Sequence, residues 1–252
     1  HIKLRENETI AINRSFFGIL RISEVSHAPG VVIRKLNHGR INHGSQILDE
    51  QLGKRPVSYF GPDSGIGVAI KTQRSRLVDS ASTSPLRIGV IGQGVSTIAA
   101  FGEAGDVIRF YEIDARVSEI ANTYFTYLSD SKADTIVVIG DARISMESEL
   151  TAQQYQGYDV LAVDAFSGDG IPVHLLTREA LSLYRQHMTP QGVIAIHISN
   201  RHFDLRSVVR SLASDAGMHA SWITDSGDKR VGEKINDWVL LTDATVLQKQ
   251  LE

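Results

Sequence analysis

The 252-residue chain contains no cysteine, which excludes disulfide bonds and thiolate metal ligands. It has no apolar run near the roughly 20 residues that a membrane-spanning helix needs, and no signal-peptide pattern. It also has no run rich in lysine and arginine, and its formal net charge is −3. A protein that binds nucleic acid through its phosphates is therefore not indicated.

Several catalytic motifs are missing as well. No H-E-x-x-H pair and no G-x-S-x-G turn occurs, so neither a zinc hydrolase nor an α/β-hydrolase is supported. His38 and His43 lie five positions apart in a segment typical of a hairpin, where histidines more often belong to strands and turns than to metal sites. We expect no metal cofactor.

The composition, 42% hydrophobic and 22% charged, is typical of a globular protein. Residues 1–60 contain short β-prone runs separated by Gly, Asn, His and Pro, which predicts an N-terminal β-hairpin domain with strands near 9–13, 16–23 and 30–36. Residues 61–85, which end in a small polar run closed by Pro85, are expected to be a connecting segment.

Residues 86–252 alternate between apolar strand-like runs and helical patterns, which predicts a mostly parallel α/β sheet covered on both faces. The predicted strands are 87–92, 107–114, 135–141, 158–166, 192–199, 219–225 and 237–243, and the predicted helices are 96–105, 117–128, 177–188 and 205–217. No helix separates the last two strands, so the last strand should run antiparallel. This arrangement favours a class I methyltransferase-like (Rossmann-like) sheet. The charged cluster at 229–234 is predicted to be a solvated loop.

Ligands bind open α/β sheets at the carboxyl ends of the strands. The first strand of this domain ends in a turn with Gly92 and Gly94, which would let the backbone approach a ligand; a simple tight turn is the alternative. The second strand delivers Glu112, 20 residues after Gly92, where a carboxylate can accept from both hydroxyls of a ribose. A solvated strand end is its alternative, and NAD and S-adenosyl ligands fit equally.

Two further strands end in aspartate. Asp141 could accept from an adenine amino group or act as the N-cap of a helix over 142–150. Asp164 follows four apolar residues, and buried acids are rare unless they are paired or functional, so it is the strongest catalytic candidate. Asp169 could lie near it across a small turn.

Seven stretches together resemble the polyamine aminopropyltransferase (spermidine synthase-like) family, and in particular a bacterial branch often fused behind a membrane-spanning or transporter-like region. The stretches are 35–46, 56–70, 87–102, 109–114, 137–143, 160–181 and 192–205. The resemblance covers about residues 16 to 242 and implies a small N-terminal β domain before a methyltransferase-like catalytic domain at 86–252.

The resemblance also implies roles for single residues. Glu112 would hold the ribose of the donor, and Asp141 with Ala142 would lie at its adenine. Asp164 would be the acid at the reacting amine, which Tyr59 would help to position.

At other positions the match to the family is ambiguous or the chain departs from the family pattern. Gln46 matches a cleft-facing glutamine of the N-terminal domain, and Asn42 competes for that match. The glycine-rich turn carries Val95 and Ser96 where the family usually has an aspartate that binds the donor's terminal ammonium. Ser167 stands where the family has its second acid after the fourth strand, and Asp169 follows two residues later as a substrate-binding candidate.

The implied function is transfer of an aminopropyl group from decarboxylated S-adenosylmethionine to a diamine such as putrescine, giving spermidine and methylthioadenosine. A methyltransferase that uses intact S-adenosylmethionine is one alternative, and a non-catalytic polyamine- or nucleoside-binding domain is another. An NAD enzyme is least favoured, because Thr97 breaks the G-x-G-x-x-G pattern. The resemblance further implies a cytoplasmic homodimer, with membrane tethering only through a region upstream of this chain.

Overall fold

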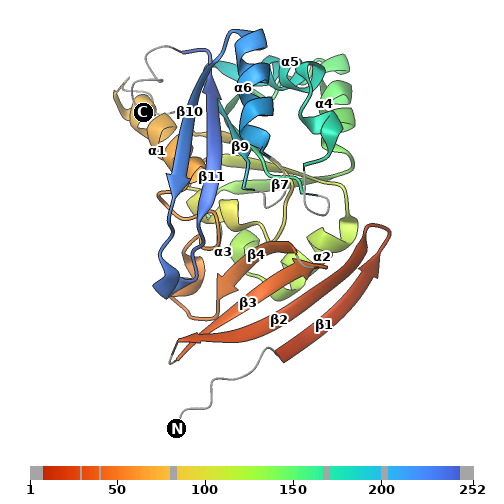
Figure 1. Ribbon diagram of the computed structural model, residues 1–252, viewed down its shortest axis with the longest axis vertical. Helices are drawn as coiled ribbons and strands as arrows, with labels where there is room; N and C mark the ends of the chain where they lie inside the picture. The colour runs from red at the N-terminus through yellow and green to blue at the C-terminus, as the bar shows by residue number, and fades with distance from the viewer. Residues whose placement is uncertain are drawn as a thin grey trace.

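The computed structural model of the chain describes residues 8–28, 30–39, 41–79, 84–166, 171–199 and 204–244. These residues form two sheets, one of four strands and one of seven. Figure 1 shows the four-stranded sheet, in red and orange, lying across one end of the larger sheet. The site described below lies where the two sheets meet.

The small sheet is antiparallel, with its strands in the order of the sequence. The strands are β1 (Glu8–Ser15), β2 (Gly18–Ala28), β3 (Val31–His38) and β4 (Ile41–Ile47). The predicted hairpin architecture is therefore confirmed. The sequence did not predict β4, because its residues INHGSQI carry too many polar side chains for an ordinary strand.

The large sheet has the strand order β10-β11-β9-β8-β5-β6-β7. Its strands are β5 (Arg87–Ile91), β6 (Val107–Glu112), β7 (Asp134–Ile139), β8 (Tyr158–Val163), β9 (Met188–His197), β10 (His219–Asp225) and β11 (Asn236–Thr242). Strands β5 to β9 pair in parallel, whereas β11 runs antiparallel to both of its neighbours. This is the predicted methyltransferase-like sheet with one antiparallel strand.

Six α-helices accompany the strands of the described residues, and two predictions need correction. The helices are α1 (Gly65–Asp79), α2 (Ala115–Tyr124), α3 (Tyr127–Asp130), α4 (Ala142–Thr151), α5 (Arg178–Gln186) and α6 (Leu205–Ala216). Helix α1 occupies most of the segment predicted to be a simple connection. The helix predicted over 96–105 is only a 3-10 turn, Thr97–Phe101. Among the described helices, none has both the length and the apolar character needed to cross a membrane.

Apolar side chains alternate between the two faces of the large sheet, so each face has its own core. One core joins the sheet to α1 and to the small sheet, through residues such as Ile66, Leu20 and Leu36. The other joins the sheet to α4, α5 and α6, which Figure 1 shows grouped together. Strand β8 is buried along its whole length, as expected for a central strand covered on both sides.

A buried carboxylate at the amino end of β6 ties α1 to the sheet. Asp106 is 2% exposed and accepts hydrogen bonds from the backbone N–H groups of Leu86 and Glu103, both at 2.9 Å. It also accepts from the Arg74 guanidinium of α1 at 2.9 Å. Arg74 forms a second ion pair with Glu103, whose side chain is 63% exposed.

We predict that Asp106→Ala lowers the free energy of unfolding by about 2–4 kcal/mol, because it leaves the backbone N–H groups of Leu86 and Glu103 without their acceptor and removes one partner of the partly buried Arg74 guanidinium. Glu103→Ala, which removes the exposed partner of the same arginine, should cost less than about 1 kcal/mol. Urea unfolding of both variants measures the difference. Equal losses would show that Asp106 does not join α1 to the sheet.

Candidate active site

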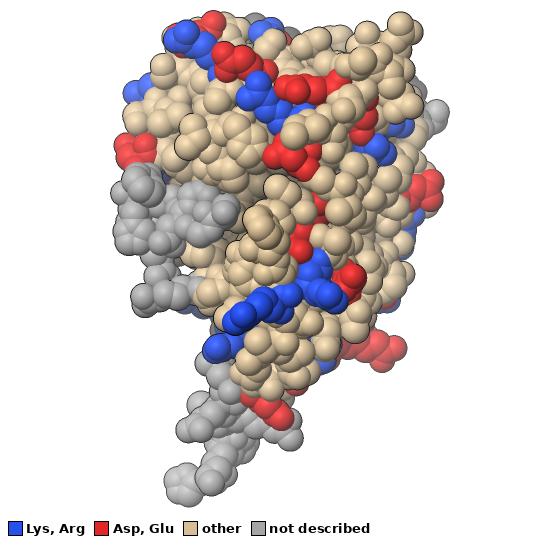
Figure 2. All heavy atoms as spheres, turned by 90° about the vertical axis from the view of Figure 1, so that its right-hand side faces the viewer, with Lys and Arg blue, Asp and Glu red and all other residues tan. Residues whose placement is uncertain are grey.

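A cavity of about 1020 Å³ lies at the carboxyl ends of β5 to β9, and β4 and the β10–β11 loop complete its lining. The acidic side chains that line it are Glu112, Asp114, Asp141, Asp164 and Asp237. Among its described lining residues, Lys234 is the one lysine or arginine. Figure 2 shows acidic side chains running down the middle of one face of the molecule. The predicted common cleft is thus present, and its charge favours a cationic ligand.

The glycine-rich turn after β5 passes through a narrow gap. A Cβ on Gly92, whose φ is +94°, would lie 2.5 Å from the carbonyl oxygen of Asp164. A Cβ on Gly94, whose φ is +53°, would lie 2.4 Å from the carbonyl oxygen of His43 in β4. The N–H of Val95 donates to that same carbonyl oxygen at 3.2 Å. The two glycines are therefore required by close backbone contacts, which is more specific than a tight turn.

Glu112 braces this turn. Its side chain accepts hydrogen bonds from the N–H groups of Gln93 and Asp114, each at 3.0 Å, and the residue is 7% exposed. Burial raises the pKa of Glu112, while these backbone donors act in the opposite direction. The alternative of a solvated strand end does not apply, because the carboxylate is buried and faces the cavity.

Asp141 is the predicted N-cap of a helix and also lines the cavity. One carboxylate oxygen accepts from the N–H of Ile144 at 3.1 Å, which makes Asp141 the N-cap of α4. The other lies 2.8 Å from Nε2 of His174. Asp141 and the following Ala142 both line the cavity beside Gly140.

Asp164 pairs with a histidine on the neighbouring strand. Strands β8 and β9 are parallel with Val163 opposite Ile196, so the next residues of each strand lie side by side. Oδ1 of Asp164 is 2.6 Å from Nδ1 of His197. Nε2 of His197 is in turn 2.8 Å from the hydroxyl of Ser199, which accepts from the N–H of Asp237 at 2.8 Å.

Aromatic rings surround His197. The imidazole stacks on Trp238 at a centroid distance of 4.7 Å and lies 5.0 Å from the ring of Tyr59. Phe166 contacts it edge-on at 5.2 Å. The Tyr59 hydroxyl donates to the carbonyl oxygen of Asn42, and burial, followed by the charge of Asp164, raises the pKa of this phenol. Tyr59 therefore stays neutral and shapes the cavity beside Asp164.

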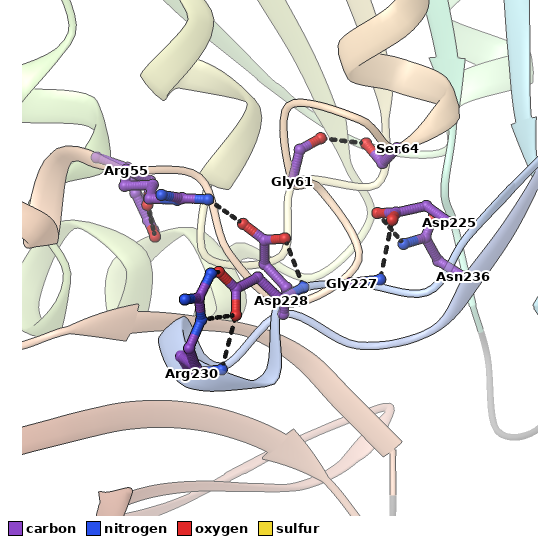
Figure 3. A network of polar contacts seen from close by, with 10 residues as sticks. Arg55, Gly61, Ser64, Asp225, Gly227, Asp228, Arg230 and Asn236 are labelled. Carbon is purple, nitrogen blue, oxygen red and sulfur yellow. Dashed lines mark hydrogen bonds and ion pairs between the residues drawn. The ribbon is translucent and has the colours of Figure 1, made fainter. Parts of the chain in front are cut away.

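The loop between β10 and β11 is held against the segment before α1, as Figure 3 shows. Arg55 donates to Glu233 at 2.9 Å, and the other oxygen of Glu233 accepts from the N–H of Asp228 at 2.9 Å. Arg230 binds Asp228 and lowers its pKa to about 2. Glu233 is only 7% exposed, so the prediction of a wholly solvated loop was wrong.

The same loop supplies a cavity wall. The N–H of Lys234 donates to the carbonyl oxygen of Ser58 at 2.7 Å, and Nζ of Lys234 lies 5.4 Å from the centre of the Tyr59 ring. Lys234 and Tyr59 thus form one side of the cavity, which we call the Tyr59–Lys234 wall. Its sequence signal is weak, because the two residues are far apart in the chain.

One predicted position, Gln46, is not part of this lining, and another cannot be placed. Gln46 is 2% exposed, donates to the carbonyl oxygen of Gly53 and to the hydroxyl of Thr126, and accepts from the N–H of Thr126. These bonds use its amide to join β4 to the segment before α3, whereas the competing Asn42 lines the cavity. Asp169 and its neighbours 167–170 lie outside the described residues.

His43 lines the cavity between β4 and the glycine-rich turn, a position that no sequence pattern predicted. Its ring lies 5.5 Å from that of His38, and no group of three or more metal-ligating side chains occurs among the described residues. Nε2 of His43 is buried and has no hydrogen-bond partner. Burial, followed by the proximity of His38, lowers the pKa of His43 from 6.5 to about 4.

No family model matches the chain, but three curated proteins are similar to parts of it. A polyamine aminopropyltransferase of Vibrio vulnificus is 38% identical over 113 residues, which is 44% of this chain and 36% of that protein. A "probable polyamine aminopropyl transferase" of Bifidobacterium longum is 31% identical over 88 residues, 35% of this chain and 18% of that protein. An N-terminal histidine N-methyltransferase of Emericella nidulans is 34% identical over 160 residues, 60% of this chain and 28% of that protein. The matches thus span about a third or less of these relatives.

Solved structures share the fold over more of the chain. The crystal structure of a "probable spermidine synthase" from Corynebacterium glutamicum has a TM-score of 0.65 and 17% identity, covering 95% of this chain and 85% of that one. Human methyltransferase-like protein 13, in complex with SAH, has a TM-score of 0.52 and 18% identity, covering 74% and 85%. At these identities the likeness concerns the fold, which agrees with the predicted methyltransferase-like sheet.

The lowered pKa of His43 predicts how stability depends on pH. Between pH 6.5 and pH 4 the unfolded chain binds a proton at this residue and the folded chain does not, so stability falls as the pH falls through this range. His43→Asn should remove up to about 3 kcal/mol of that decline. Urea unfolding at pH 4 to 7 measures it, with His219→Asn as the matched substitution on a strand away from the cavity. Equal pH slopes for the wild type and His43→Asn would contradict the prediction.

Proposed function

We propose that this chain is a polyamine aminopropyltransferase that transfers an aminopropyl group from decarboxylated S-adenosylmethionine to an amine such as putrescine. The observation that carries the proposal is the acidic cavity, which Glu112 and Asp164 both line from the ends of the two strands that flank β5. A cationic donor and a cationic acceptor both suit this charge, whereas a dinucleotide with its phosphates does not.

The donor's nucleoside fits the end of the cavity made by β5, β6 and β7. Glu112 has carboxylate lone pairs left for the ribose hydroxyls, in addition to those that hold the glycine-rich turn. Asp141 and Ala142 lie at the next strand end, where an adenine would be placed. Gly92 and Gly94 also line this end of the cavity, where they let the turn run between the carbonyl oxygens of Asp164 and His43.

Asp164 would bind the acceptor amine. The sulfonium of the donor supplies an activated alkyl group, so the chain has to orient the amine and remove its proton. An alkyl ammonium titrates near 10, as a lysine does, and a carboxylate at this position stabilises the ammonium and orients it. Tyr59 closes the site beside Asp164. Orientation of two bound reactants can contribute roughly 7–11 kcal/mol to lowering the barrier.

A methyltransferase is the second candidate, and a specific observation favours it. Val95, which stands where an acid would bind the terminal ammonium of a decarboxylated donor, packs against Gly44 of β4 instead. The cavity therefore lacks, at that position, the carboxylate that would repel an intact methionine group. The relative in Emericella nidulans is also named as a methyltransferase. A non-catalytic polyamine- or nucleoside-binding domain is the third candidate, and it predicts binding without turnover.

Three finer expectations stay proposals drawn from the resemblance. They are Asp169 as a second substrate-binding acid, assembly as a homodimer, and a membrane region upstream of this chain in the full protein. None of them is needed for the chemistry proposed for Asp164 and Glu112.

The proposal is tested by calorimetry and turnover with both donor forms. We expect the protein to bind decarboxylated S-adenosylmethionine more tightly than the intact form and to release methylthioadenosine when putrescine is added. A preference for the intact donor, with transfer of a methyl group, would reject the proposal in favour of the methyltransferase. Binding of either donor without any transfer would favour the non-catalytic domain.

Two variants should separate chemistry from donor binding. Asp164→Asn should lower turnover by roughly 10²–10⁴-fold, because it removes the carboxylate at the amine, while leaving methylthioadenosine binding unchanged. Glu112→Gln should weaken methylthioadenosine binding by roughly tenfold or more, because it removes charge-assisted hydrogen bonds to the ribose. Normal turnover in Asp164→Asn would sink the assignment of this residue.

A further inference from the structure

The chain of hydrogen bonds behind Asp164 suggests where the proton of the acceptor amine goes. The chain runs from Asp164 through both nitrogens of His197 to the hydroxyl of Ser199. Asp164 and Ser199 both line the cavity, and His197 lies between them at 3% exposure. The inference below rests on the proposed function, since it concerns a protonated amine bound in that cavity.

The polar contacts fix the direction of each hydrogen bond. The carboxylate of Asp164 can only accept, so Nδ1 of His197 carries the proton that they share. In a neutral His197 with its proton on Nδ1, Nε2 is an acceptor, so the hydroxyl of Ser199, which accepts from the N–H of Asp237, donates its proton to Nε2. The Nε2 lone pair of a neutral His197 therefore accepts from the Ser199 hydroxyl, and this hydroxyl connects it to the cavity.

The rings around His197 hold it in this orientation. Trp238 stacks on one face at an interplanar angle of 21°, Tyr59 lies 5.0 Å away, and Phe166 contacts the ring edge-on. The described titratable or charged groups that face it from the surrounding elements are Asp164, Tyr59, Lys234 and Asp237. Asp164 contacts the imidazole directly, so an imidazolium formed here would be ion-paired.

An alkyl ammonium is a much weaker acid than a carboxyl group, so a carboxylate alone is a poor acceptor for its proton. Imidazole is the side chain whose ordinary titration lies closest to neutral pH, which makes it the better general base for this proton.

We propose that His197 is the proton acceptor for the amine substrate, with Ser199 as the relay and Asp164 as the counter-ion. The ammonium gives one proton to the Ser199 hydroxyl oxygen, and the Ser199 hydroxyl proton moves to Nε2 of His197. The freed nitrogen lone pair then forms the new N–C bond, while the C–S bond breaks and its electron pair remains on sulfur. After the product is released, the imidazolium gives its proton to the solvent.

The test compares pH profiles of kcat and kcat/KM in variants that keep the local shape. In His197→Asn the side-chain amide can still donate a hydrogen bond to Asp164, but it has no basic nitrogen that could accept the proton of the amine. We expect kcat to fall by roughly 10²-fold and the acid limb of the wild-type profile to disappear, with methylthioadenosine binding retained. An unchanged pH profile with full activity would overturn the proposal, because the proton would then leave without His197.

Ser199 offers a matched pair should His197→Asn fail to fold. Ser199→Ala removes the relay but leaves the Asp164–His197 pair in place, so kcat should fall by roughly tenfold or more. Ser199→Thr keeps the hydroxyl and should restore most of the activity. Equal activities of the Ala and Thr variants would overturn the relay.

A measurement that needs no turnover separates this inference from the proposed function. Nitrogen-15 NMR of labelled histidine, with the His197 signals assigned by their loss in His197→Asn, should show a proton on Nδ1 and none on Nε2 at alkaline pH. The opposite tautomer would overturn the inference even in an active enzyme. If the expected tautomer is found in a protein that transfers no aminopropyl group, the proposed function is rejected. The inferred hydrogen bonding of His197 then still stands.

Discussion

The site depends on one close backbone contact between the two sheets. The glycine-rich turn passes between the carbonyl oxygens of Asp164 and His43, and the N–H of Val95 binds the latter. Gly44 in β4 leaves the space that the Val95 side chain occupies, since a Cβ on Gly44 would lie 2.4 Å from Cγ2 of Val95. This contact sets the small sheet above the carboxyl ends of the large one. It acts together with the shared core and the Gln46–Thr126 hydrogen bonds to hold β4 over the strand ends, where the acidic cavity lies.

The parallel register of β8 and β9 brings a second pair of side chains together at the cavity. Because β8 and β9 pair with Val163 opposite Ile196, their exits place a carboxylate beside an imidazole without any special loop. Buried charge at such a position is costly unless it is hydrogen-bonded, and here each acid is. Glu112 is held by backbone donors, Asp141 caps α4, and Asp164 is paired with His197. The acids that would bind ligand are thus also the ones that organise the local backbone.

The sequence predicted the strands of the large sheet well, since long apolar runs such as VLAV before Asp164 have one simple interpretation. It also predicted that polar residues would meet at the strand ends. It missed β4 because polar residues stand on both faces of this strand. Asn42 and His43 line the cavity, and Ser45 and Gln46 are buried, so apolar and polar residues do not alternate along it. It missed α1 because glycines 65 and 67 in its first turn resemble loop residues, although they are there for close packing against Trp238 and the 61–62 backbone. Pairings such as Asp164 with His197 require strand register, which no local pattern contains.

The Tyr59–Lys234 wall joins parts of the chain that are distant in sequence, since Arg55 and Glu233 are 178 positions apart. Contacts between residues so far apart in sequence raise the contact order of the fold, which is associated with slow folding. The nucleoside end of the cavity, by contrast, is assembled from consecutive strand exits between Gly92 and Ala142. The half of the cavity suited to a nucleoside therefore depends on one continuous part of the chain, whereas the half suited to an amine depends on contacts between distant parts of it.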